Sequence, residues 1–121
     1  MANVPTALFG GTLDGTTPVD SDIAPLYADM PAPKGKIVIA GAGHMSYTNV
    51  CSLPPAQFVA KLKDMCFKPG MIDGDKASAL TKSFAVAWLN RWVKGDLAQN
   101  KALQTELPAK FSAASVVYGG V

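Results

Sequence analysis

Two short apolar runs in this chain are each followed directly by glycines. The first covers residues 4–9 and leads into a pair of glycines, and the second covers residues 37–40 and leads into a Gly-Ala-Gly sequence. Short apolar runs bounded by glycine are typical of buried strands, because glycine allows the chain to turn tightly where the strand ends. The pattern therefore predicts two buried strands.

Three other stretches repeat their apolar residues at the spacing of an α-helix. The first lies between its expected N-cap, Asp20 or Ser21, and Pro31, which ends it. The second opens at the Pro-Pro pair of residues 54–55, and the third runs from about residue 75 to 94. Their apolar faces are, in chain order, Ile23, Leu26, Tyr27 and Met30; Phe58, Val59, Leu62, Met65 and Cys66; and Leu80, Phe84, Ala85, Trp88, Leu89 and Trp92.

The order of the predicted elements is strand, helix, strand, helix, helix. This alternation indicates an α/β fold in residues 1–95, with two parallel strands joined by a crossover helix. For residues 96–121 we expect a C-terminal tail with one short helix followed by irregular chain. Parallel sheets are normally covered on both faces and need several strands, so two strands are too few. We therefore expect the sheet to be completed by missing chain, by a partner or by a swapped copy.

Composition and charge exclude several classes of protein. The 121 residues are 49% hydrophobic and carry a net charge of +2 without a basic cluster, so nucleic acid is not an expected partner. No apolar run approaches the roughly 20 residues of a membrane span, and residues 1–5 lack the basic and apolar regions of a signal peptide. One histidine and scattered carboxylates make no recognisable metal site, and no cofactor is expected.

The two loops that follow the predicted strands contain an acid and the single histidine. Asp14 follows the first strand and His44 follows the second. Ligands and catalytic groups of open α/β sheets lie at the carboxyl ends of the strands, and a right-handed crossover would bring these two ends together. An aspartate bonded to an imidazole fixes its tautomer and stabilises the imidazolium that forms during acyl transfer. Taken singly, either residue would be read as an ordinary polar loop residue.

Three segments resemble the esterase, cutinase and dienelactone-hydrolase-like branch of the α/β-hydrolases. Residues 5–14 (PTALFGGTLD) are similar to its acid-bearing strand and loop, residues 36–44 (KIVIAGAGH) to its histidine segment, and residues 87–93 (AWLNRWV) to its final helix. The resemblance implies that residues 1–95 are the C-terminal part of an α/β-hydrolase domain. It also implies a serine hydrolase acting on small-molecule or lipid carboxylic esters, in which Asp14 orients His44 and His44 acts as general base and then acid.

The chain departs from this family because it contains no Gly-x-Ser-x-Gly nucleophile elbow. We expect Ser46 to bond within its own loop. The nucleophile and the oxyanion donors would then come from an N-terminal hydrolase portion or a second chain, and the isolated chain would be inactive. Two alternatives stay open: an upstream Cys or Asp nucleophile, and a non-catalytic α/β interaction or structural module with relic hydrolase loops.

Cys51 and Cys66 bracket the segment that follows the histidine. They either form a disulfide that pins this segment or stay free as small buried apolar residues. A disulfide would favour a secreted or periplasmic location, which the sequence otherwise leaves open. Tyr47 either lines a substrate pocket or packs in the fold, whereas Trp88 and Trp92, at helical spacing, are expected in the core.

Overall fold

The computed structural model describes residues 3–54 and 59–121 and contains one mixed three-stranded sheet. The strands are β1 (Thr6–Gly11), β2 (Lys34–Ile39) and β3 (Ala114–Gly119), in the spatial order β1-β2-β3. β1 and β2 run parallel, and β3 pairs antiparallel with β2. The α/β class and the two expected parallel strands are confirmed.

The count of two strands is wrong, because the C-terminal segment adds a third. After α4 (Gln99–Lys101), a π-helical turn η5 (Ala102–Glu106) and α5 (Leu107–Lys110), the chain returns along β2 as β3. Residues 96–121 are therefore not an irregular tail. In β3 partly buried residues alternate with exposed ones from Ala114 to Tyr118, as in a half-covered strand. The sequence itself does not alternate there, because the exposed Val117 is as apolar as the partly buried Val116.

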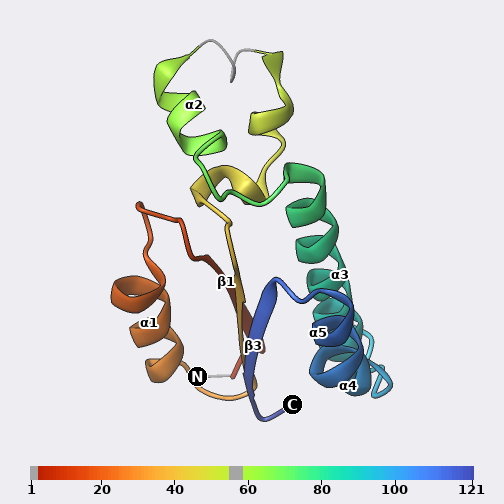
Figure 1. The fold of residues 1–121 in the computed structure, drawn as a ribbon. Coiled ribbons are helices and arrows are strands. Elements are labelled where there is room, and N and C mark those ends of the chain that lie inside the picture. Colours follow the sequence, from red (N-terminus) through yellow and green to blue (C-terminus); the bar gives the residue numbers. More distant parts are fainter. Residues whose placement is uncertain (1–2, 55–58) are drawn as a thin grey trace.

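Helices lie on both sides of the sheet (Figure 1). The short α1 (Ala24–Asp29) lies on one side, and α3 (Gly74–Val93) lies on the other together with α4 and α5. The core is formed between the sheet and α3, and its most deeply buried large side chains are Ile37, Ile39, Leu80, Phe84 and Leu103. Two of them, Leu80 and Phe84, lie in α3 at a helical spacing, so one stripe of this helix packs on the sheet.

The longest helix matches its prediction within one residue. α3 begins after Asp73, whose carboxylate accepts hydrogen bonds from the backbone N–H groups of Asp75 and Lys76 at 3.1 Å each. Such an N-cap satisfies donors that have no partner within the helix. Beyond the helix, Gly95 adopts a positive φ of 73°, as is common just after a helix C-terminus.

The other two predicted helices differ from the expectation. Helical backbone begins at Val19 with the π-helical turn η1 (Val19–Ile23), so Asp20 and Ser21 lie inside it. Neither residue is the N-cap, and the Ser21 hydroxyl donates to the neighbouring Asp22 instead. The second predicted helix is shorter than expected, α2 (Ala60–Cys66).

Before α2, the chain forms a 3-10 turn, η3 (Val50–Ser52). The predicted start of the second helix at Pro55, and its apolar residue Phe58, lie outside the described residues. In Figure 1, α2 stands beyond the carboxyl ends of β1 and β2, away from the layers formed by α1 and α3. No helix of the described part of the chain is long and apolar enough to cross a membrane.

Candidate functional site

The histidine loop follows β2 and turns at glycines. Gly41 has a φ of 76°, a backbone region that favours glycine. His44 then opens the short 3-10 turn η2 (His44–Tyr47). The hydroxyl of Ser46, buried in this turn, accepts a hydrogen bond from the N–H of Gly43 at 2.9 Å. Ser46 therefore bonds within its own loop, as expected, and helps to fix the backbone that carries His44.

Asp14 is held by a set of hydrogen bonds from its own loop. Its Oδ1 accepts from the backbone N–H groups of Thr16 at 2.8 Å and Thr17 at 3.0 Å, and its Oδ2 accepts from the Thr17 hydroxyl at 2.8 Å. The side chain is only 3% exposed. A carboxylate with this many donors has one orientation, so its second oxygen points in a fixed direction.

Asp14 and His44 meet at the carboxyl ends of β1 and β2. The distance between His44 Nδ1 and Asp14 Oδ2 is 3.0 Å, so the predicted contact is confirmed. Two further bonds join the loops: Leu13 N–H donates to the Ala42 carbonyl at 2.9 Å, and Gly41 N–H donates to the Thr12 hydroxyl at 2.9 Å. Because the acid and histidine loops are tied together in this way, the contact does not depend on two independent mobile segments.

The contact with Asp14 determines which imidazole nitrogen is available for proton transfer. An ionised carboxylate accepts only, so the contact selects the tautomer of the neutral imidazole in which Nδ1 carries the hydrogen and Nε2 the lone pair. The imidazole side chain is 39% exposed and borders a cleft of about 270 Å³. The arrangement can therefore take up a proton at Nε2 while the buried carboxylate stabilises the charge that appears on the ring.

The ionisation of Asp14 follows from its surroundings. Burial raises the pKa of this carboxyl, but hydrogen bonds from Thr17, His44 and Thr16 outweigh burial and hold the pKa below its ordinary value of 3.8. A carboxyl with a lowered pKa contributes stability above its unfolded value and loses it as the pH falls through the folded value. The site is thus expected to be intact near neutral pH and to weaken only below about pH 4.

This linkage gives a testable pH dependence. The difference in free energy of unfolding between the wild type and Asp14→Asn should shrink as the pH falls below about 4, where Asp14 becomes protonated. Urea unfolding at a series of pH values measures it, and Asp29→Asn, an exposed substitution on α1, serves as the matched control. A wild-type advantage that persists unchanged at pH 2 would contradict the assignment of a stabilising Asp14 carboxylate.

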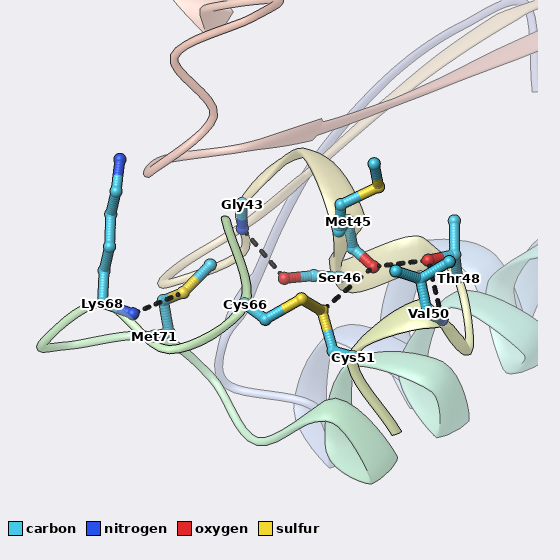
Figure 2. Close-up of a disulfide and its surroundings, with 9 residues drawn as sticks. All are labelled: Gly43, Met45, Ser46, Thr48, Val50, Cys51, Cys66, Lys68 and Met71. Carbon is cyan, nitrogen blue, oxygen red and sulfur yellow. Dashed lines mark hydrogen bonds between the residues drawn. A yellow bond between two sulfur atoms is a disulfide. The ribbon is translucent and has the colours of Figure 1, made fainter. Parts of the chain in front are cut away.

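A disulfide joins the segment after His44 to the end of α2. Cys51 and Cys66 are bonded with a Cα–Cα distance of 5.3 Å, so of the two states open at the sequence level the bridged one is present. The bridge lies next to Met45 and Ser46 (Figure 2). It borders a second cleft, of about 410 Å³. Apart from this bond, α2 packs within the described chain mainly on η2 and η3. The disulfide therefore ties α2 to the histidine loop.

Reduction should release α2 while leaving the sheet folded. With the disulfide cut, we expect amide hydrogen exchange in residues 60–66 to rise by about tenfold or more, since few contacts remain, and exchange in β2 to stay slow. Exchange measured by mass spectrometry with and without a phosphine reductant tests this, and a Cys51→Ala, Cys66→Ala double variant without reductant should behave like the reduced protein. Unchanged protection of α2 in both samples would show that packing alone holds it.

Tyr47, Trp88 and Trp92 pack in or against the core and do not line either cleft. Tyr47 packs against the core and meets Phe9 edge to face with ring centroids 6.4 Å apart, and it borders neither cleft described above. Burial together with the nearby Asp14 charge raises the pKa of Tyr47. Trp88 is buried, and Trp92 packs beside it with ring centroids 5.8 Å apart, in agreement with the expected core role.

Several residues of the site were not among the residues predicted from the sequence, although an Asp in a Gly/Thr/Pro loop is expected to bond to nearby N–H groups. Thr16 and Thr17 bind the Asp14 carboxylate, and an Asp two and three residues before threonines in a Gly-rich loop is a pattern of such local bonds. The opposite wall of the His44 cleft comes from Met65, Lys68 and Met71, which follow α2 or end it. Nothing in the local sequence around these three residues indicates that they face His44.

Outside the Asp14–His44 pair, the described residues hold no group of three or more His, Cys, Asp or Glu side chains that could bind a metal ion. The other ion pair recorded in the described chain, Lys101–Glu106 at 3.1 Å, is exposed and borders neither cleft. The buried aspartate bonded to a half-exposed histidine is therefore the chemically distinctive feature. Comparison of the sequence with protein-family models and with curated proteins finds no match.

Proposed function

We propose that this chain supplies the acid and the histidine of a Ser-His-Asp triad in a carboxylic-ester hydrolase. The observation that carries the proposal is the 3.0 Å contact between Asp14 Oδ2 and His44 Nδ1 at the ends of two adjacent parallel strands. Acid–histidine pairs at this edge of an α/β sheet serve acyl transfer in α/β-hydrolases, in the chain order nucleophile, acid, histidine. The sequence resemblance of both loops to that family points to the same chemistry.

In the proposed mechanism His44 moves protons and Asp14 does not. Nε2 takes the proton of the attacking serine hydroxyl, and the imidazolium then protonates the leaving alcohol. The same nitrogen next activates the water that releases the acid. Asp14 remains ionised throughout and stabilises the imidazolium. Its low exposure and the several hydrogen-bond donors that hold its carboxylate suit it to this role.

The nucleophile of this proposal comes from other polypeptide, either an N-terminal hydrolase portion or a second or swapped chain. The hydroxyl of Ser46, the serine nearest in sequence to His44, accepts a hydrogen bond from the N–H of Gly43 within its own loop. Two surfaces support the presence of further chain. β1 pairs on one side only within the described residues, and Val86, Leu89 and Val93 form an apolar stripe on α3 that is 56%, 55% and 76% exposed.

The disulfide bears on where such an assembly would work. Structural disulfides persist in oxidising compartments and are rare in the reducing cytosol. The Cys51–Cys66 bond therefore supports a secreted or periplasmic location for the proposed hydrolase.

The test is to purify the tagged chain from its native source and to find the reactive serine. Native and denaturing mass spectrometry should reveal a second polypeptide, and a fluorophosphonate probe should label a serine of that polypeptide while abolishing hydrolysis of p-nitrophenyl acetate. The recombinant chain by itself should neither label nor turn over the ester. If the chain purifies alone and stays inactive when each fraction of the source extract is added to it, the non-catalytic module is favoured. If the probe labels this chain itself, Ser46 is the first serine to test.

A further inference from the structure

The residues after α2 form a tight turn that fixes the backbone of Lys68. Met71 N–H donates to the Lys68 carbonyl at 3.1 Å, with Pro69 and Gly70 between them. Gly70 has a φ of 82°, and proline followed by a glycine of positive φ is the combination that a type II turn favours. The N–H of Lys68 also donates to the Met71 sulfur at 3.1 Å (Figure 2). The turn thus closes on itself in both directions.

This turn is docked directly on the histidine loop. Ile72 N–H donates to the Gly41 carbonyl at 2.9 Å. A Cβ added to Gly41 would lie 2.7 Å from the Gly70 carbonyl oxygen, and the terminal methyl of Met71 occupies the space that a side chain on Gly43 would need. Because the two loops approach this closely, the position of Lys68 is set relative to His44.

The cleft between the turn and His44 has an apolar wall and one permanent cation. Its side chains include Leu13, Met65 and Met71. Among the lining residues that the structure describes, none is a carboxylate and Lys68 is the only lysine or arginine. Neither ion pair recorded in the described chain involves Lys68. Figure 2 shows its side chain extended from the turn, with the ammonium group away from the disulfide. A molecule bound beside His44 therefore meets apolar side chains and a positive charge.

We propose that Lys68 determines the substrate specificity of this site by favouring esters that carry a carboxylate on a short apolar chain. The inference rests on the proposed function, since it concerns the cleft that His44 borders. The ester group would lie at His44, the methylene chain would contact Leu13, Met65 and Met71, and the distal carboxylate would pair with the Lys68 ammonium.

The expected preference is moderate, because Lys68 lies at the rim and is exposed to solvent. Exposed ion pairs give small gains that salt screens. We expect an anionic ester to bind about fivefold more tightly than a neutral ester of the same length, a difference of about 1 kcal/mol. Raising the salt concentration from 0.02 M to 1 M should remove most of it.

The experiment compares three methyl esters of similar length: monomethyl adipate, which is anionic, dimethyl adipate, which is neutral, and methyl 6-aminohexanoate, which is cationic. Titration of the ¹⁵N-labelled full chain at pH 8 should shift the amide signals of Gly43, His44 and Met71, with the anionic ester binding most tightly. Lys68→Gln should abolish the preference, and Lys68→Glu should reverse it toward the cationic ester. Lys63→Gln, on the same segment but outside the cleft, is the matched control.

Binding and catalysis separate the two proposals. If Lys68 governs binding but the purified assembly hydrolyses none of the esters, Lys68 is a carboxylate-binding residue of this cleft and the hydrolase function fails. The other outcome is that the assembly hydrolyses the esters and that the ratio of KM for the anionic ester to KM for the neutral ester is the same in Lys68→Gln as in the wild type. The specificity inference is then overturned and the proposed function is unaffected. Absence of any shift at the cleft with all three esters would also overturn it.

Discussion

Replacing His44 by alanine in the complete enzyme is expected to lower kcat for ester hydrolysis by roughly 10⁴- to 10⁶-fold, since one residue serves as base and as acid in successive steps. Asp14→Asn should cost less, because a neutral imidazole still accepts a proton when it is poorly oriented. The measurement is the steady-state hydrolysis of p-nitrophenyl acetate by the purified assembly. Near-UV circular dichroism should show that both variants keep the wild-type fold.

Asn49→Ala provides the matched control for this prediction. Asn49 is exposed in the same loop, and its side chain makes no cap hydrogen bond to the turn that follows it. The control should retain nearly full activity. Equal hydrolysis by the wild type and by His44→Ala would remove the basis for a triad, and the Asp14–His44 pair would then be a structural contact in an interaction module.

Gly11→Ala is expected to destabilise the protein by about 3 kcal/mol and to displace the histidine loop. Gly11 ends β1 in a buried position, and an added Cβ would overlap the carbonyl oxygen of Ala42 and lie 2.7 Å from its carbonyl carbon. The obstacle is backbone, so it cannot turn away as a flexible side chain would. The same carbonyl accepts the Leu13 N–H, and moving it would lengthen the Asp14–His44 contact two residues further on.

Gly15→Ala is the natural comparison, because an added Cβ there meets nothing within 4 Å and Gly15 has no positive φ. It should change the free energy of unfolding by less than about 0.5 kcal/mol. Chemical denaturation of both variants measures the difference, and the chemical shifts of the His44 ring report the loop displacement. Similar stability of the two variants would mean that β1 and the histidine loop can separate without cost.

The sequence predicted those elements in which local pattern and burial agree. β1, β2 and α3 have apolar runs or stripes ended by glycine or capped by aspartate, and each appears within a few residues of its expected place. The acid and histidine were predictable because each directly follows such a strand. Their meeting depends only on the two strands being parallel neighbours, which the topology of crossover connections favours.

Other parts depend on contacts that sequence order does not reveal. β3 is short, and its pairing partner β2 lies much earlier in the sequence, so the pattern of β3 alone did not distinguish it from a tail. The early start of η1 and the short α2 were not predicted, because sequence pattern fixes the presence of a helix better than its first and last residues. Likewise, the Met65, Lys68 and Met71 wall faces His44 only because the turn after α2 docks on Gly41 and Gly43.

The central place of β2 has a consequence for synthesis on the ribosome. One edge of β2 pairs with β1, which shortly precedes it in the sequence, but the other pairs with β3, which follows it only at residues 114–119. Loop closure over so many residues is entropically costly and slow. During translation, β2 therefore remains with one open edge until residues 114–119 have left the exit tunnel. During this interval the open edge of β2 can pair with strands of other chains. Binding of a chaperone to that edge would prevent such pairing.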